Sequence, residues 1–227
     1  MQNNHYGNII NQRTERMVLE TNKVLKNTYL LLSLTLMFSA VTAAFSIAAS
    51  VPAINPIFTL LAYFGLLFGI QATRNSAMGL VLTFTLTGFL GFSIAPLLNF
   101  YLTTFSNGAE LIMLSLGATG AIFLGLSIVA MNPNRDFTKL GSFLGVGSIV
   151  CLIAIIVNLF LQLPAIHLAL SLMIALISGG MILWQTNQII QGGERNYITT
   201  TVTLYVSILN IFLTLLQFLA MFAGRRD

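Results

Sequence analysis

The residues of this chain that could do chemistry are amides and hydroxyls in its last two hydrophobic segments. One cluster lies in ILWQTNQIIQGG, residues 182 to 193, where Gln185, Thr186, Asn187 and Gln188 follow a long apolar run. A second series recurs at spacings of four, three, four and three residues, which places its members on one face of a helix. These are Thr203, Ser207, Asn210, Thr214 and Gln217. Such side chains form hydrogen bonds but carry no titratable group.

These residue types do not assemble a known intramembrane active site, so we predict that the protein is not an enzyme. A serine protease would need a serine within hydrogen-bond reach of a histidine, but Ser178 and His167 lie about 16 Å apart along one predicted helix at 1.5 Å per residue. The last segment has no lysine for a retinal Schiff base, and no H-E-x-x-H motif is present. Because His5 and His167 are distant and Cys151 is the single cysteine, we predict neither a metal nor a cofactor.

The composition identifies the elements that must position these side chains. Hydrophobic residues make up 56% of the 227 residues and charged residues 7%, whereas a soluble domain carries about 25% charged residues. A membrane-spanning helix needs roughly 20 apolar residues, and seven runs of about that length are present. We place them at residues 27 to 50, 56 to 72, 77 to 102, 109 to 131, 140 to 162, 165 to 190 and 198 to 223.

The chain therefore divides into a polar tail and one membrane domain. Residues 27 to 227 are predicted to form an all-α bundle of seven transmembrane helices. The first run is longer than the 7 to 15 residues of a signal peptide core, so we expect it to stay in the membrane. Residues 1 to 26 are polar and mixed in charge, which is typical of a disordered tail.

The basic residues predict the orientation of the bundle. If the N-terminus is cytoplasmic, eight of the ten Lys and Arg residues fall on the cytoplasmic side, as the positive-inside rule requires. Arg225 and Arg226 are the exceptions, and they would suit a cytoplasmic C-terminus if the short second segment did not span. The pI near 9.5 thus reflects membrane topology and gives no reason to invoke nucleic acid.

Small residues at intervals of four predict where helices pack closely, because association within lipid depends on close backbone approach. These small residues are Gly65 and Gly69, then Gly117, Ala121 and Gly125, and finally Gly141 and Gly145.

Pro96 lies inside the third segment, where we expect a kink.

The polar residues of the last two segments form two seams that most simply face each other. Ser171, Ser178 and Gln185 recur every seven residues in the sixth segment, and Gln188 follows on the same side. One interpretation is interhelical hydrogen bonding, at roughly 0.6 kcal/mol per bond within a membrane. The other is a hydrated pathway. Its candidate lining residues are Gln185, Gln188, Thr203, Ser207 and Asn210.

Several of these stretches carry a resemblance to a known family. The motifs WQTNQII, NYI and LYVSILNIF, at residues 184 to 190, 196 to 198 and 204 to 212, resemble the C-terminal half of the Bax inhibitor-1-like family of seven-helix membrane proteins. VLKNTYLLLSLTLMFSA and TLTGFLGFSIAPLLNFYL, beginning at residues 24 and 85, resemble its bacterial YccA-like branch. The resemblance runs from about residue 18 to the end of the chain and implies a bundle with the last helix at its centre.

The resemblance also implies a site that this chain has altered. In many family members two aspartates of the sixth and seventh helices share a proton and gate a pH-sensitive calcium leak. Gln185 and Ser207 occupy the matching positions, and neither has the carboxylate that titrates or attracts a divalent cation. We expect that they hydrogen-bond to each other as a neutral latch. Arg74 lies near a basic patch that in family members can pair with the aspartate, so it is a candidate cytoplasmic latch. With Gln185 in that place, we expect its side chain to extend to the lipid headgroups.

Two functions follow from the resemblance. The YccA-like branch implies an interaction with the membrane-anchored AAA protease FtsH and a damping of its turnover of membrane proteins in the inner membrane. The polar N-terminus would then serve as a handle that enters the protease pore. The alternative is a leak for calcium or protons along the polar seam, which the absence of a deep titratable group disfavours.

Overall fold

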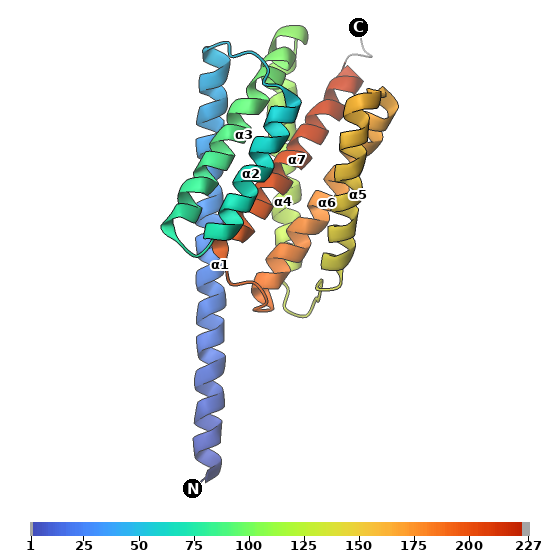
Figure 1. Ribbon diagram of the computed structural model, residues 1–227. Coiled ribbons are helices and arrows are strands. Elements are labelled where there is room, and N and C mark those ends of the chain that lie inside the picture. The colour runs from blue at the N-terminus through green and yellow to red at the C-terminus, as the bar shows by residue number, and fades with distance from the viewer. Residues whose placement is uncertain (1, 224–227) are drawn as a thin grey trace.

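Seven long helices make up the part of the chain that the structure describes (Figure 1). The computed structural model describes residues 2 to 223, and the side chains from residue 19 onwards. Each helix is long and apolar enough to cross a membrane, which confirms the predicted seven-span bundle. The helices are α1 (Gln2–Ala48), α2 (Pro56–Thr73), α3 (Ala77–Thr104), α4 (Gly108–Ala130), α5 (Leu140–Leu161), α6 (Pro164–Ile190) and α7 (Tyr197–Ala223).

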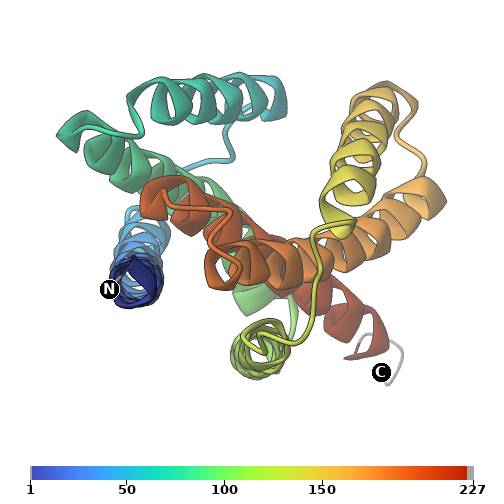
Figure 2. The same cartoon turned by 90° about the horizontal axis from the view of Figure 1, so that it is seen from below.

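Helix α7 lies at the centre of the bundle, as the resemblance implies. It contacts α1, α2, α3, α4 and α6, and the view along the bundle shows it enclosed by them (Figure 2). Twelve residues of α7 are buried, against one in α2 and two in α5. Among the helices that the structure describes, α5 packs on α6 alone, so most of its apolar surface faces the surrounding lipid.

The second segment forms a complete helix. Asn55 precedes it and its side-chain oxygen accepts a hydrogen bond from the backbone N–H of Ile57 at 2.9 Å. Pro56 occupies the first position of the helix, where a backbone N–H would have no partner within the helix, so the lack of this group in proline costs no hydrogen bond. Asn55 and Pro56 thus mark the start of α2. Helix α7 ends on the opposite side of the bundle from the start of α1 (Figure 1).

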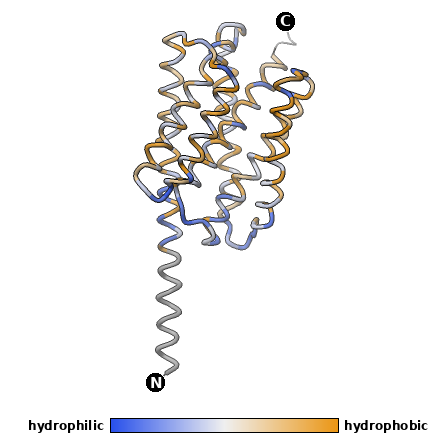
Figure 3. Tube along the Cα trace, in the orientation of Figure 1, coloured by the Kyte–Doolittle hydropathy of each residue, from blue (hydrophilic) through white to orange (hydrophobic). Residues whose placement is uncertain are grey.

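Helix α1 differs from the prediction because its backbone is helical from Gln2 onwards. The polar tail is therefore a continuation of the first span that passes the ends of the other helices (Figure 1). Nucleation is the unfavourable step of helix formation, and adding a residue to an existing helix is not. The hydrophobic colouring is concentrated in the bundle (Figure 3). The connections at the end of the bundle from which the start of α1 extends are hydrophilic.

Pro96 lies inside α3 without ending it. A proline removes the hydrogen bond to the carbonyl four residues earlier, which here belongs to Phe92. The Ser46 hydroxyl of α1 donates to that carbonyl at 3.2 Å, and Ser46 is almost fully buried. A neighbouring helix therefore satisfies the backbone group that the proline leaves free.

Replacing Ser46 with alanine is expected to lower the free energy of unfolding by about 1 kcal/mol, because it removes the partner of the Phe92 carbonyl. The same change in a Pro96→Ala background should have a smaller effect, since residue 96 then supplies a backbone N–H. Denaturant titrations of the four proteins in detergent measure the coupling between the two sites. An equal effect of Ser46→Ala in both backgrounds would contradict this role.

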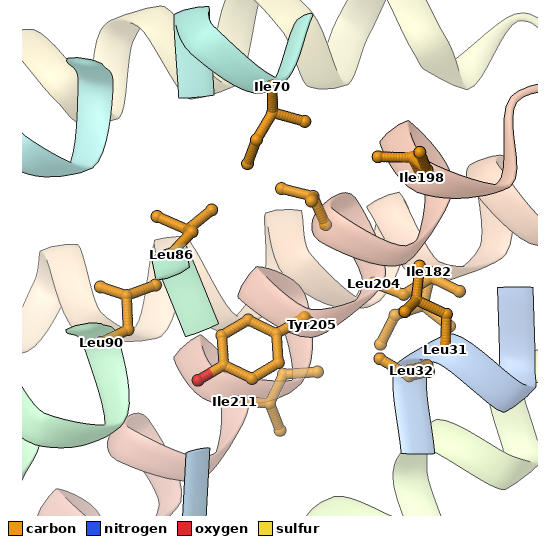
Figure 4. Close-up of a cluster of buried hydrophobic side chains, with 11 residues drawn as sticks. Leu31, Leu32, Ile70, Leu86, Leu90, Ile182, Ile198, Leu204, Tyr205 and Ile211 are labelled. Atoms are coloured by element: carbon orange, nitrogen blue, oxygen red, sulfur yellow. The ribbon is translucent and has the colours of Figure 1, made fainter. Parts of the chain in front are cut away.

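The main apolar core joins α7 to four of the helices around it. Figure 4 shows its side chains, which come from α1, α2, α3, α6 and α7. Leu204 and Ile182 are fully buried at the contact between α7 and α6. The members are Leu31, Leu32, Ile70, Leu86, Leu90, Ile182, Ile198, Val202, Leu204, Tyr205 and Ile211.

The predicted glycine contacts are confirmed in part. A Cβ atom at Gly141 would lie 2.6 Å from the Trp184 ring nitrogen, so α5 packs closely on α6 there. At Gly69 the nearest atom is a Leu82 side-chain carbon at 3.1 Å. A Cβ atom would instead meet open space at the glycines Gly65, Gly117, Gly125 and Gly145.

The prediction that Gly117, Ala121 and Gly125 line a packing face is therefore wrong within this chain. Ala121 is exposed on the same outer face of α4. The buried face of α4 carries hydroxyl residues, among them Ser115 and Thr119, which donate to the carbonyls four residues earlier. A hydroxyl that bonds to its own helix can be buried at little cost, so it competes with glycine for contact positions.

Candidate functional site

A ladder of hydrogen bonds joins α6 and α7 along most of their length. Near the end that faces the N-terminus, Gln185 donates through Nε2 to Oγ1 of Thr200 at 3.1 Å. In the middle, Asn210 donates through Nδ2 to Oγ of Ser178 at 3.2 Å. At the far end, the Ser171 hydroxyl donates to Oε1 of Gln217 at 2.7 Å. The two polar series of the sequence therefore meet at one interface.

Two of the candidate residues make their bonds within α7. The hydroxyl of Thr203 donates to the Thr199 carbonyl at 3.1 Å, and that of Ser207 to the Thr203 carbonyl at 2.8 Å. The expected latch between Gln185 and Ser207 is not formed. Thr200, the partner of Gln185, lies seven residues before Ser207, which is about 10 Å along a helix.

Gln188 points away from α7, unlike Gln185. Its Nε2 donates to the Thr138 hydroxyl in the connection between α4 and α5 at 3.2 Å. Gln188 lies three positions after Gln185, so the two side chains are about 60° apart around the helix axis. The neighbouring groups decide which way each side chain turns. Gln188 therefore does not belong to the ladder in which the sequence placed it.

Asn187 belongs to the polar cluster of the sixth segment but not to the candidate lining residues, and it organises the same connection. The side chain is fully buried, and its Nδ2 donates to the carbonyls of Ala130 at 3.2 Å and Arg135 at 2.8 Å. Its Oδ1 accepts from the backbone N–H of Phe137 at 3.0 Å. One amide thus satisfies three backbone groups of a turn that has no regular structure. The polar cluster near residue 187 serves this turn as much as the contact with α7.

An exposed carboxylate completes this turn. Oδ1 of Asp136 accepts from the Thr138 backbone N–H at 2.8 Å. Hydrogen bonds from the Thr138 side chain and backbone lower the pKa of Asp136 below its ordinary value. A lowered pKa means that the ionised form supports the turn above the unfolded-state pKa and that this support is lost as the pH falls through the folded-state pKa.

The connection before α7 is held in a similar way by Asn196. Its Oδ1 accepts from the N–H groups of Ile198 and Thr199 at 3.1 and 3.0 Å, so it caps the start of α7. Its Nδ2 donates to the Arg74 carbonyl at 2.9 Å. The Arg74 side chain is exposed, so position 74 contributes its backbone to the described contacts, and the suggested latch role has no contact in its support.

A second polar node, also missed, lies between α1, α3 and α7. The Tyr205 hydroxyl is 2.6 Å from Oγ of Ser39 and donates to the Thr87 carbonyl at 3.2 Å. Tyr205 is 1% exposed, and a buried tyrosine hydroxyl normally needs such partners. Tyr205 lies two residues from both Thr203 and Ser207, which is off the face that the spacing of the polar series follows. The feature of the sequence that could have predicted this node is a tyrosine in the middle of a transmembrane segment.

Chemically, the site is a neutral network of hydrogen bonds. Among the side chains from residue 19 to residue 223, no three His, Cys, Asp or Glu residues gather closely enough to hold a metal ion. The amides and hydroxyls of the ladder partner one another, which fits a structural seam between α6 and α7.

The comparisons with known proteins agree with this architecture. Residues 21–224 match the family described as inhibitor of apoptosis-promoting Bax1. Over 208 residues the chain is 46% identical to a protein of Escherichia coli strain K12 named modulator of FtsH protease YccA, covering 92% of this chain and 94% of that protein. An uncharacterised protein of Pseudomonas aeruginosa is 44% identical over 90% of this chain and 92% of its own. An uncharacterised membrane protein of Vibrio cholerae is 43% identical, over 88% and 90%.

Proposed function

Because the chain belongs to the Bax inhibitor-1 family of membrane proteins, we propose that it modulates the turnover of inner-membrane proteins by the FtsH protease. The similarity to the E. coli modulator carries this proposal, since it extends over 92% of the chain. The site supports an interaction protein over an enzyme, because its polar groups are used in holding helices together.

The basic end of the bundle is the proposed cytoplasmic face. The connections between α2 and α3, α4 and α5, and α6 and α7 lie at the same end as the start of α1 (Figure 1). They carry exposed Arg74, Arg135, Lys139 and Arg195, as the positive-inside rule expects of cytoplasmic loops. With this orientation the N-terminus is cytoplasmic and the C-terminus periplasmic.

Residues 1 to 26 are the proposed handle for the protease. From Gln2 onwards the backbone of this segment is helical and not unstructured, and a helical segment can serve as a handle as well. A helix that extends beyond a bundle depends on its own local stability, and short isolated helices are marginal in water. A contact at its base, Arg195 to Glu20 at 3.6 Å, joins two exposed side chains, and such surface ion pairs stabilise little.

Reconstitution with purified FtsH tests the proposal. In vesicles that contain FtsH and a membrane-protein substrate, the full-length protein is expected to slow substrate degradation severalfold, as followed on gels. A variant without residues 2 to 18 should lose most of this effect, while a variant with a scrambled sequence there reports on length alone. An unchanged degradation rate with the full-length protein would overturn the proposal, and equal slowing by the truncated variant would overturn only the handle.

The alternative, a calcium or proton leak along the seam, has less support. Calcium prefers anionic oxygen ligands, whereas Gln185, Asn210 and Gln217 offer neutral amides that are already bonded to α6 or α7 partners. Calcium release from the same vesicles measures this activity directly. A pH-dependent release by the full-length protein would favour the leak over the interaction with the protease.

A further inference from the structure

We propose that the bundle binds one acyl chain of a membrane phospholipid in a cavity between α1, α4 and α7. The cavity has a volume of about 460 Å³, which falls in the range of about 300 to 1,000 Å³ that is usual for small-molecule sites. Its walls come from α1, α3, α4 and α7 and are almost entirely apolar. Leu36, Ala43, Leu98, Leu116, Ile208 and Phe212 are among the lining residues.

The cavity has a lateral mouth that opens to the membrane. Among the described residues, the Cα atoms of α1 and α4 do not approach within 8 Å of each other. The cavity residues Ala40 and Ala44 of α1 and Leu116 and Gly120 of α4 are exposed on either side of this gap. A Cβ atom at Gly120 would meet no atom within 4 Å. A hydrocarbon chain can therefore enter from the bilayer without any helix moving.

The length of the cavity along the helices indicates which kind of ligand it can hold. Along α1 it reaches from Leu36 to Ile47, and along α4 from Phe123 to Ile112. Eleven residues of helix span about 16 Å, which is close to half of the roughly 30 Å hydrocarbon thickness. The cavity thus has the length of one leaflet, the leaflet at the end of the bundle where α7 finishes. A partner transmembrane helix, about 10 Å wide and 30 Å long, would not fit in it.

The inner end of the cavity is closed by two aromatic rings. The rings of Tyr29 and Phe123 bridge α1 and α4 there, with centroids 5.8 Å apart. The polar atoms in the wall are already bonded, because Ser39 pairs with Tyr205 and the Thr119 hydroxyl donates to the Ser115 carbonyl. These lining groups require no polar partner from a ligand, so an acyl tail fits and its headgroup stays at the membrane surface.

Native mass spectrometry of protein taken from vesicles of palmitoyl-oleoyl phosphatidylglycerol and phosphatidylethanolamine tests the proposal. After exchange into mild detergent, the wild-type protein is expected to retain a stoichiometric phospholipid. Gly120→Phe fills the mouth and should lose it. Gly125→Phe is the matched control, because Gly125 is equally open to lipid but does not line the cavity, and it should retain the phospholipid.

A second pair of variants keeps the test independent of one substitution. Ala44→Phe narrows the mouth from α1, and Val41→Phe adds the same ring at an exposed position outside the cavity. Thermal unfolding in detergent identifies any variant that does not fold. Three results would overturn the proposal: no phospholipid on the wild-type protein, equal retention by the filling variants and their controls, or a second copy of the chain on the wild-type protein that Gly120→Phe removes.

Discussion

Replacing Gly91 with alanine is expected to lower the free energy of unfolding by about 1 to 3 kcal/mol, the usual range for overpacking a well-filled interface. Gly91 is buried in α3, and a Cβ atom there would collide with the Ser39 carbonyl oxygen, the Ser39 hydroxyl and the Thr42 hydroxyl of α1. A backbone oxygen cannot turn aside as a flexible side chain can. The α1 helix must move, and the Ser39 contact with Tyr205 moves with it.

Gly117→Ala is the matched control for this prediction. Gly117 also lies within a transmembrane helix, but a Cβ atom there meets nothing within 4 Å. Alanine should therefore leave the stability unchanged or raise it by about 0.5 to 1 kcal/mol, since glycine is the poorer helix former. Denaturant titration of both variants in detergent gives the comparison. Similar stabilities for the two variants would show that α1 does not pack on α3 as described.

The contrast between these two glycines shows how far the sequence determines the fold. The number, length and order of the spans follow from hydrophobic runs, because a long apolar segment has few alternatives in a membrane. The choice of packing face does not follow. Gly117 belongs to a stripe of three small residues that meets open space, whereas the shorter pair of Gly91 and Ala95, also four residues apart, includes the close contact. Which neighbour lies opposite a glycine depends on the whole bundle.

The candidate site shows the same division. The spacing of Asn210 and Gln217 correctly predicts a polar face of α7 that meets α6, because helical periodicity is a local property. The partners are set by the register of two helices, which placed Gln185 opposite Thr200 and away from Ser207. The start of α1 is a further case. Its polar composition predicts disorder, but its backbone continues the helix of the first transmembrane span.

The second large effect is expected at Asn187. Asn187→Leu keeps a side chain of similar size but removes the two donors and one acceptor that hold residues 130 to 137. A buried group left without a partner costs about 1 to 3 kcal/mol, and three backbone groups lose theirs here. We expect a loss of about 3 kcal/mol in the free energy of unfolding, less whatever water recovers at this end of the bundle.

The loss of stability should be confined to α5 and the turn before it. Among the described helices α5 packs only on α6, so its position depends on the turn that Asn187 holds. Hydrogen exchange at the Phe137 amide should become much faster in Asn187→Leu, while amides near Asn210 keep their protection. Gln188→Leu, which removes a single bond to Thr138, should change stability by less than about 1 kcal/mol. If both variants lose the same stability, or if exchange at Phe137 is unchanged, the turn is held by other contacts.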